Sequence, residues 1–467
     1  MPHRLNYSTS PTPSGPGRTA IRVTAMARVV VVGGGFGGMA AAARLAKLGH
    51  EVTLVEASGR LGGALGFVEQ DGFRWDSGPT STLLPAVVRD LFRKSGRPLE
   101  RELELVPVEP VRRHHFEDGT TLDLPAGSRG KQHVAVAQAL GDRGRRRRDP
   151  APAEQWVDYV HGFAEVWDAL RRDWLERPWS PDHASRQARE LLATRASLHR
   201  YTERLLRDER LRQLATYRAV LEGQAPRDVP AWFGMWSYVE QNFGAWTVPG
   251  GMGRLAEALE DRLATRRVTV LRRTTVHDLA VSGNRVAGVR TSGGDLDADV
   301  VVCAIDPRRL PALAAHVART MPALPPVVCH VGLVGEVPEL PHEVVLHGDP
   351  MIVLRTNGTA PEGAHAWTLL GRGRLAEDMV TTLHRSGVRV RDQVTVRVDR
   401  SPRQLVEDWG GSPLGVLWQG RGTLARRMGT RGPLEGAYLA GAHTTPGAGL
   451  PSVGLSAALV AQLVGPG

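Results

Sequence analysis

The pattern of apolar and polar positions along the chain first predicts a strand, a tight turn and a helix. The apolar run Arg28–Val32 ends at the glycines Gly33–Gly35, an alanine-rich segment follows, and a second apolar run ends at Glu56. A short β-branched run bounded by glycine is typical of a buried strand, whereas the longer alanine-rich segment is typical of a helix. Such a unit directs the free amide groups at the start of the helix towards a phosphate group.

The middle of the chain follows a helical period from about residue 131 to 243. Most of the tryptophans lie there, and the first long helix carries apolar residues at the spacing of a single face. This aromatic stripe comprises Trp156, Tyr159, Val160, Phe163, Trp167, Leu170 and Trp174. The stripe has two interpretations: it packs into the core, or it forms a wall for a long apolar ligand or a lid that faces a membrane.

After the helical region the pattern returns to alternating strands and helices. The segment Pro249–Gly253 opens a helix that runs to about Ala264. Strand patterns follow at Val268–Leu271, Thr274–Val281, Arg285–Arg290 and Leu296–Ala304. Residues 325 to about 400 predict a second, mixed sheet with a helix near Leu375–Leu383, and short strands are expected earlier, around Leu103–Val108 and Arg112–Leu124.

The glycines of the first turn suit a dinucleotide. Gly33 permits the sharp bend, Gly35 lets the backbone approach the phosphates, and Gly38 lets the helix pack closely on the sheet. Glu56, about 20 residues further on, is placed to accept hydrogen bonds from a ribose diol. Because an acid at this position disfavours a 2′-phosphate, the pattern predicts FAD or NAD rather than NADP.

The chain has a formal net charge of +10 at pH 7, and much of the excess lies in scattered arginines. The densest cluster, Arg143–Arg148, has two interpretations: a solvated surface loop or a contact for lipid headgroups. No nucleic-acid-binding module accompanies the cluster, so we expect no nucleic-acid partner.

The cysteines and histidines provide no metal or disulfide pattern. Cys303 and Cys329 lie in apolar, strand-like runs and are expected to be buried thiols in a reducing cytoplasm. The histidines lack metal-binding spacing, so no metal site is predicted, and His114 and His115 are expected on a strand that faces solvent. No run of about 18 apolar residues is free of glycine or charge, so no membrane-spanning helix is predicted.

Several motifs occur in an order that identifies a family. They are Gly33–Gly38, Glu56 with Arg60–Gly63, Phe73–Thr80, Tyr238–Gly253, Val300–Asp306 and Gly441–Pro451. With these motifs the chain resembles the carotenoid oxidoreductases of the bacterial phytoene-desaturase type, within the FAD-dependent, amine-oxidase-like superfamily. The resemblance covers nearly the whole chain, and the ordered set of motifs is far more specific than the glycine turn alone.

The resemblance implies a set of residues that bind FAD. Glu56 would hold the adenosine ribose, and Val276 would contact adenine through its backbone. The segment Pro446–Ser456 would run under the isoalloxazine ring, with the amides of Gly454 and Leu455 at a helix start near the pyrimidine edge. The full expected set is Gly33, Gly35, Phe36, Gly37, Gly38, Glu56, Ala57, Arg60, Gly62, Gly63, Val276, Gly441, Ala442, Gly454 and Leu455, of which Arg60, Gly62 and Gly63 would approach the pyrophosphate or ribityl chain.

Two positions depart from the family pattern. Ala64 follows the paired glycines where the family commonly has arginine, which removes a cofactor contact. Ala442 and His443 stand where many superfamily members carry an acidic residue. His443 has two interpretations: it hydrogen-bonds the cofactor, or its role is only structural.

These observations predict an α/β fold with two interleaved domains, since 467 residues are too many for one ordinary domain. We expect a Rossmann-like FAD-binding domain with a mixed sheet and a β-meander, and an α+β substrate domain that contains the helical, aromatic-rich insertion. The expected segments are a disordered leader (1–26), the FAD-binding domain (27–125, 246–310 and 426–467), the helical region (126–245) and the substrate-domain sheet (311–425). Met26 is an alternative start to Met1.

The resemblance implies an FAD-dependent desaturase of phytoene or a later carotene, with hydride transfer to flavin N5. Glu240 and Asp76 are candidate proton acceptors, although each is equally a candidate for a helix cap or a buried hydrogen-bonding group. Two alternatives stay open: an amine or porphyrinogen oxidase of the same superfamily, and a flavin-binding protein without turnover, for which Ala64 is the only hint.

Carotenes partition into bilayers, so the expected partners are an apolar polyene, a quinone or another electron acceptor, and a membrane surface. A hydrocarbon offers no polar handle, so its binding must come from apolar burial. We expect a cytoplasmic protein attached peripherally to the membrane through its aromatic middle region and the Arg143–Arg148 cluster.

Overall fold

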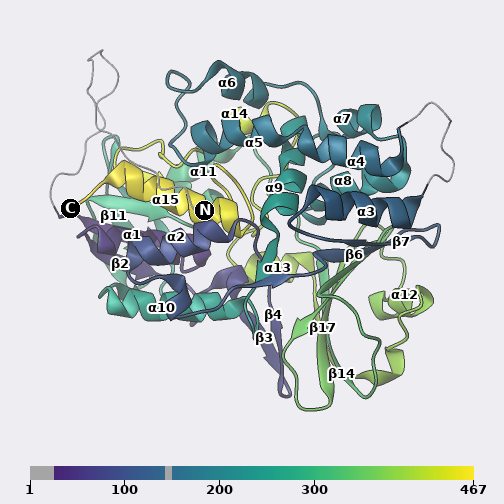
Figure 1. The fold of residues 1–467 in the computed structure, drawn as a ribbon. Helices are drawn as coiled ribbons and strands as arrows, with labels where there is room; N and C mark the ends of the chain where they lie inside the picture. The colour runs from purple at the N-terminus through teal and green to yellow at the C-terminus, as the bar shows by residue number, and fades with distance from the viewer. Residues whose placement is uncertain (1–25, 142–149) are drawn as a thin grey trace.

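The computed structural model describes residues 26–141 and 150–467 (Figure 1). Apart from Met26, the predicted leader lies outside the described residues, as does the Arg143–Arg148 cluster. Two large sheets and a group of helices dominate the described part of the chain.

The first large sheet has five parallel strands in the order β19-β13-β1-β2-β9. Its strands are β1 (Arg28–Val32), β2 (Glu51–Val55), β9 (Thr269–Leu271), β13 (Val300–Cys303) and β19 (Ala437–Leu439). Val29 pairs with Val52 on one side and with Val300 on the other. Valine-rich strands like these suit a parallel sheet because such a sheet is buried on both faces.

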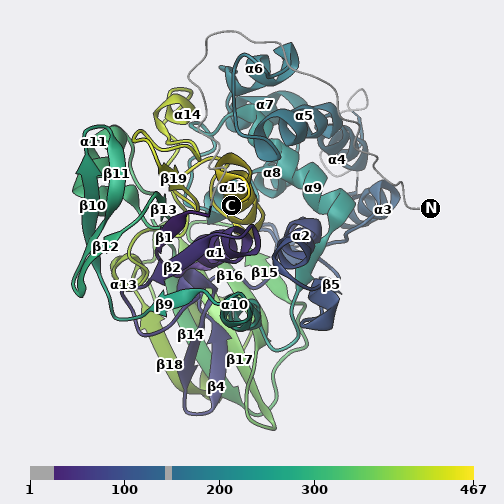
Figure 2. The same ribbon diagram turned by 90° about the vertical axis from the view of Figure 1, so that its left-hand side faces the viewer.

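Helices cover one side of the parallel sheet, and a β-meander covers the other (Figure 2). The helical side comprises α1 (Phe36–Lys47), α2 (Pro85–Ser95), α10 (Gly253–Thr265) and α15 (Leu450–Val464). The other side comprises β10 (Val276–Ser282), β11 (Arg285–Thr291), β12 (Gly294–Asp297) and α11 (Pro311–Val317). The predicted Rossmann-like sheet with a β-meander is confirmed, although the five-stranded sheet is parallel throughout rather than mixed.

The second large sheet has seven strands in the order β18-β14-β17-β16-β15-β6-β7. These are β6 (Arg112–His115), β7 (Thr121–Leu124), β14 (Val327–Val334), β15 (Glu343–Leu346), β16 (Met351–Gly358), β17 (Ala364–Arg372) and β18 (Val394–Arg400). Residues 112–124 therefore belong to this sheet, and not to the first FAD-binding segment in which we expected them. The local pattern of a strand does not specify its partner, and β6 pairs in parallel with β15 from far along the chain.

His114 on β6 is buried, so the prediction that it faces solvent was wrong. Its Nδ1 atom lies 2.8 Å from Nε2 of His347, and its ring stacks against Phe116. The Tyr217 ring of a neighbouring helix packs against it at nearly a right angle, with ring centroids 5.6 Å apart. The polar sequence of β6 predicted exposure, but side chains from other segments of the chain pack over His114 and bury it.

The helical region contains the predicted aromatic stripe. Its helices are α3 (Arg129–Leu140), α4 (Pro152–His161), α5 (Ala164–Leu170), a π-helical turn (Arg171–Leu175), α6 (Arg186–Leu192), α7 (Leu198–Leu205), α8 (Glu209–Leu221) and α9 (Met235–Phe243). The helix expected to carry the whole stripe breaks at Gly162, a residue of low helix propensity. All seven stripe residues are nonetheless buried in one hydrophobic core, as the first interpretation predicted.

Shorter elements complete the fold. They are β3 (Phe67–Gln70), β4 (Phe73–Asp76), β5 (Val106–Val108), β8 (Ala245–Thr247), α12 (Met379–Arg385), α13 (Pro402–Asp408) and α14 (Thr423–Arg426), with 3-10 turns at Gly63–Leu65, Leu99–Arg101, Ala231–Gly234, Pro307–Arg309 and Arg391–Gln393. The helix expected near Leu375–Leu383 begins at Met379, because the Asp378 side chain accepts hydrogen bonds from the amides of Val380 and Thr381. No helix in residues 26–141 and 150–467 is both long and apolar enough to cross a membrane.

Candidate flavin site and adjoining cavity

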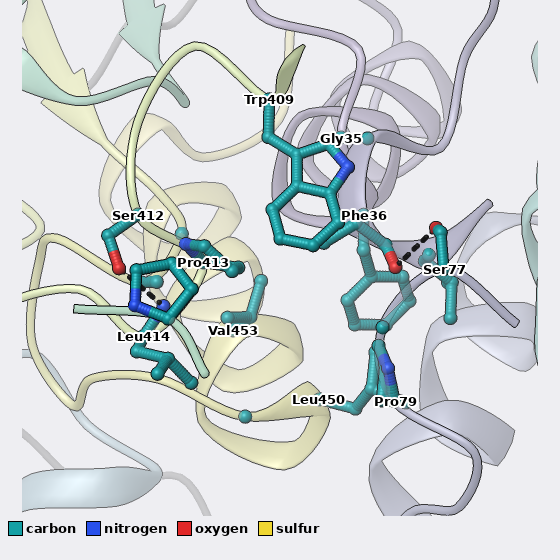
Figure 3. A pocket seen from close by; sticks show the side chains of 18 of the residues that line it. Gly35, Phe36, Ser77, Pro79, Trp409, Ser412, Pro413, Leu414, Leu450 and Val453 are labelled. Atoms are coloured by element: carbon teal, nitrogen blue, oxygen red, sulfur yellow. Dashed lines mark hydrogen bonds between the residues drawn. The ribbon is translucent and has the colours of Figure 1, made fainter. Parts of the chain in front are cut away.

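A cavity of about 880 Å³ opens beyond the carboxyl ends of β1, β2 and β13 and extends to the seven-stranded sheet. This is the position at which open α/β sheets bind their ligands. Figure 3 shows the side chains of Phe36, Trp409 and Val453 gathered around it, from α1, the segment after α13, and α15. Segments from both ends of the chain thus meet at one cavity.

The glycine turn after β1 brings backbone to the cavity wall. Gly33 has φ +100°, a conformation that favours glycine, and a Cβ atom on Gly35 would meet no atom within 4 Å because the position faces the cavity. A Cβ atom on Gly38 would lie 1.9 Å from the carbonyl oxygen of Gly33. Gly37 lies close to the C-terminal motif, since an added Cβ atom would lie 3.0 Å from Cα of Gly441. The turn therefore tolerates no side chain where the helix meets the strand.

Glu56 lies at the end of β2 and lines the cavity together with Ala57. Its carboxylate accepts hydrogen bonds from the amides of Gly34 and Ser58, both at 2.7 Å. A carboxylate has capacity for about four such bonds, so hydrogen-bonding sites are left for a ligand.

Most of the other residues expected to bind FAD also line the cavity: Gly62, Gly63, Val276, Gly441 and Ala442. Arg60 does not line the cavity, and its side chain is exposed in the segment that follows β2.

Gly454 and Leu455 do not line the cavity either. We expected them at a helix start, but α15 begins at Leu450, so their amides lie within the helix rather than at its open end. Gly454 instead packs against α2, where an added Cβ atom would lie 2.7 Å from Val87. The residues of the first turn that do face the cavity are Leu450, Pro451 and Val453.

His443 is a buried, cavity-lining residue whose two ring nitrogens have no hydrogen-bond partner in the described chain. Its Nε2 atom is 3.8 Å from the Asp306 carboxylate. Burial lowers the pKa of His443 despite this acid, so the ring is neutral at pH 7. A neutral imidazole can both donate and accept a hydrogen bond, so a ligand with polar groups would satisfy it.

Asp76 is held by the start of α10. Its carboxylate accepts hydrogen bonds from the amides of Met252 and Gly253, at 3.0 and 2.9 Å, and from the side chain of Asn357. Burial raises its pKa, and these hydrogen bonds oppose the increase. Its position is that of a cap for α10 that also touches the cavity.

Glu240 on α9 lies in a charged cluster that lines the cavity. Arg112 donates to both of its carboxylate oxygens, at 2.8 and 2.5 Å. Arg112 also donates to Glu343, which accepts further hydrogen bonds from Arg355 and from the Tyr217 hydroxyl. Besides Glu240, the cluster contains four residues that no local pattern predicted, because they lie on four elements far apart in the chain: Arg112, Tyr217, Glu343 and Arg355.

The residues present fit a flavin dinucleotide. The glycine turn leaves room for phosphates, a carboxylate stands at the end of β2, and His443 lacks a protein partner for either ring nitrogen. The family model of flavin-containing amine oxidoreductases matches residues 36–465. The chain belongs to this family. As a member of this family, the protein is an FAD-dependent oxidoreductase.

Within this family the protein is similar to enzymes of carotenoid metabolism. It is 29% identical to a zeta-carotene-forming phytoene desaturase of Myxococcus xanthus, over 93% of each chain. It is 30% identical to the hydroxyneurosporene desaturase of Cereibacter sphaeroides, over 94% of this chain and 97% of the relative. Among solved structures, the cyclohexylamine oxidase of Brevibacterium oxydans has a TM-score of 0.61 at 17% identity, over 94% of this chain and 99% of that one. The structural likeness confirms the fold.

Neither cysteine is in a disulfide, and both are buried. Burial raises the pKa of each thiol to about 12, so neither is a thiolate at pH 7. Among residues 26–141 and 150–467, no group of three or more His, Cys, Asp or Glu side chains is arranged to hold a metal ion.

Proposed function

We propose that this flavoenzyme desaturates a carotenoid precursor, phytoene or a later carotene. The observation that carries the proposal is the similarity to two carotenoid desaturases over more than nine-tenths of each chain. The cavity supports it, because one continuous space extends from the glycine turn to the face of the second sheet, so a substrate on that sheet would lie in the same cavity as the cofactor.

The chemistry that FAD supplies when bound is the acceptance of a hydride at N5. The residues of the chain must then bind the polyene, exclude water and accept the proton that leaves the neighbouring carbon. Apolar side chains near the glycine turn, including Phe36, Leu450 and Val453, would bury the hydrocarbon, at roughly 25 cal/mol for each Å² removed from water. Both predicted proton acceptors stay candidates: Arg112 holds Glu240 through both carboxylate oxygens, whereas two amides and Asn357 hold Asp76, whose pKa is raised by burial.

The test is an anaerobic absorbance measurement on the purified holoenzyme with phytoene-loaded liposomes. We expect the flavin band to bleach while polyene bands grow at longer wavelength. If the flavin is bound but neither band changes with phytoene or with later carotenes, the proposed function is wrong.

We also propose that the enzyme meets its substrate on the cytoplasmic surface of a membrane and passes electrons to a quinone or another acceptor. Exposed apolar side chains in the helical region, Val134 at 52% and Phe243 at 42%, support the membrane contact. The buried aromatic stripe does not contribute to such a contact. In a flotation assay with anionic liposomes at low salt, we expect the enzyme to rise with the vesicles and to be partly released by salt. Failure to float would contradict the proposal.

A second candidate, an amine or porphyrinogen oxidase, is favoured by one observation: charged side chains line part of the cavity. The same anaerobic assay with primary amines and with a porphyrinogen separates the candidates. Bleaching by either small molecule and by no polyene would favour the second.

A further inference from the structure

One ion pair at the end of α8 borders two cavities. Arg218 of α8 and Glu222, the residue that follows this helix, line the main cavity and also a smaller cavity of about 30 Å³. Pro446 and Gly447 of the C-terminal motif form part of the wall of the smaller cavity. The pair therefore lies at the boundary between the two spaces.

The pair is held against the residues that precede α15. Nε of Arg218 donates to Oε1 of Glu222 at 2.9 Å, and the Arg218 guanidinium lies 4.5 Å from the centre of the Trp236 ring. Its Nη2 atom lies 3.1 Å from the point that a Cβ atom on Gly449 would occupy. The next residue, Leu450, is one of the apolar side chains that we propose bury the polyene. The ion pair thus borders the place proposed for the substrate.

The Glu222 carboxylate is held by fewer hydrogen bonds than the two proton acceptors that the sequence predicted. Arg112 donates to both oxygens of Glu240, and Asp76 accepts three hydrogen bonds. Glu222 accepts one, at Oε1, and no partner for Oε2 is present in residues 26–141 and 150–467. Its side chain is 16% exposed, so the carboxylate reaches the surface of the cavity that it lines.

The surroundings of Glu222 favour its protonated form more than water does. Burial raises the pKa of Glu222, because removing a carboxylate from water disfavours its charged form. Three cations oppose the increase: Arg218 beside it, Arg427 on the wall of the smaller cavity, and Arg372 of β17. A carboxylate whose pKa is moved towards the working pH is a stronger base in its ionised form.

The smaller cavity offers a place for the proton to leave. Its volume of about 30 Å³ exceeds the roughly 10–15 Å³ that one water molecule needs. Arg218, Glu222 and Gln224 contribute polar side chains to its wall. Water there would contact Glu222 from outside the main cavity, so it would take up a proton without wetting the space proposed for the polyene.

We propose that Glu222 is the catalytic base of the desaturation. The inference rests on the proposed function and assigns its proton step to a residue that the sequence analysis did not select. The polyene loses a hydride from one carbon to the cofactor and a proton from the adjacent carbon to Oε2 of Glu222. The electron pair of the second C–H bond becomes the new C=C bond. Neutral Glu222 then releases its proton to water in the smaller cavity.

The test measures the rate at which phytoene, or a later carotene, in liposomes bleaches the flavin of the anaerobic holoenzyme between pH 4 and pH 9. For the wild type we expect the rate to rise with pH through a midpoint above the ordinary 4.5, since only ionised Glu222 accepts a proton. Glu222→Gln should bleach about a hundredfold more slowly or less, without that midpoint. Glu222→Asp retains a carboxylate and should stay within about tenfold of the wild-type rate.

Arg218→Gln tests the base without removing it. Arg218 lowers the pKa of Glu222, so its loss should move the midpoint of the pH profile upwards by about one pH unit. FAD affinity and polyene binding are measured for each variant by fluorescence titration. A role of the ion pair in structure alone would change these affinities or the overall rate, but it would not move the midpoint.

Glu407→Gln is the matched control. Glu407 also lines the main cavity and pairs with an arginine four residues away in the sequence, Arg403, at 2.8 Å. Its side chain is 58% exposed, so it lacks the burial that distinguishes Glu222. We expect this variant to keep the wild-type rate and the wild-type midpoint.

The outcomes separate the two proposals. If polyene bleaches the flavin of Glu222→Gln within threefold of the wild-type rate and with the same midpoint, the proposed function stands and this inference is wrong. An unmoved midpoint in Arg218→Gln would also overturn the inference, and this result can be read even if Glu222→Gln does not fold. If no polyene bleaches the wild-type flavin, both proposals fail.

Discussion

Single side chains in the cavity wall are held in place before any ligand arrives. Glu56 accepts two backbone hydrogen bonds at 2.7 Å, one from the glycine turn and one from the loop that follows β2. The carboxylate is therefore oriented by the same backbone that forms the turn. Because its rotamer is already set, the Glu56 side chain loses little further entropy when a ribose binds there.

Glu56→Gln is predicted to weaken FAD binding roughly tenfold or more, because a hydrogen bond to a charged group contributes about 1.5 kcal/mol or more. The dissociation constant is measured by titrating apoprotein with FAD and following flavin fluorescence. Glu51→Gln, at the exposed opposite end of β2, is the control and should bind FAD as the wild type does. Equal affinities for the Glu56 and Glu51 variants would contradict the role of Glu56.

At the scale of elements, close backbone approach joins the strand, the turn and the helix. The contact between Gly38 and Gly33 leaves no space for a methyl group, so β1 and α1 can pack only as they do. On the other sheet, β6, β15 and β16 are joined by a buried ion-pair network as well as by strand pairing. Close backbone packing therefore fixes the cavity wall at the first sheet, and a buried ion-pair network fixes the wall at the second sheet.

Gly38→Ala is predicted to destabilise the protein by about 3 kcal/mol and to lower FAD affinity, because overpacking forces the helix away from the strand. Urea unfolding measures the first effect, and FAD titration measures the second. Gly130→Ala in α3 is the matched control, since its Cβ atom would meet its nearest neighbour at an ordinary 3.7 Å. That variant should be unchanged or slightly more stable.

Glu343→Gln is predicted to cost about 3 kcal/mol of stability at pH 7, because it leaves two buried guanidinium groups without their shared carboxylate. The folded protein holds the Glu343 pKa at about 2, below the ordinary 4.5, so ionised Glu343 stabilises the fold above pH 4.5. This contribution is lost as the pH falls towards 2. The difference in urea midpoint between wild type and variant should therefore narrow over that range.

Glu190→Gln is the control for the pH experiment, because its pair with Arg186 lies on the exposed face of α6. Exposed ion pairs contribute little to stability, so the urea midpoint of this variant should equal that of the wild type at every pH. If the difference in urea midpoint between wild type and the Glu343 variant stayed constant from pH 5 to pH 2, the stabilising role of the ion-pair network would be contradicted.

At the scale of the whole molecule, the cavity is built from segments drawn from nearly the full length of the chain. Its walls include the turn after β1, the start of β10, the segment after β13 and the beginning of α15, together with the face of the seven-stranded sheet. A ligand that contacts all of these segments stabilises the folded arrangement in which they meet. The stability of the fold should therefore depend on the bound cofactor.

Removal of FAD is predicted to lower the free energy of unfolding, and FAD at a hundredfold excess over its dissociation constant should restore about 2.7 kcal/mol. Urea unfolding of apoprotein with and without FAD measures this difference. Riboflavin, which lacks the pyrophosphate and adenosine, is the control and should restore less at the same concentration. No difference between apoprotein and reconstituted protein would contradict the placement of the cofactor across these segments.

Local patterns predicted the strands of the parallel sheet and the glycine turn, because strand burial, positive φ and close helix packing each restrict residue type at a fixed spacing. The role of Glu56 in binding FAD stays a prediction. Local patterns predicted less well where a residue's position depends on the point at which a helix begins or on the path of a loop. The α15 start was expected about four residues too late, since the cap is set by Gly449 and the proline turn rather than by the later glycine. Arg60 was placed by analogy, and its loop directs it to solvent.

The sequence by itself thus determined the family, the cofactor and the strand–turn–helix unit, because all of these are properties of contiguous residues. Only the tertiary structure decided that residues 112–124 join the second sheet and that Arg112, Tyr217, Glu343 and Arg355 form one cluster. The physical reason is that strand pairing and buried charge pairing are interactions between segments far apart in the chain, and no local preference specifies which partner will be met.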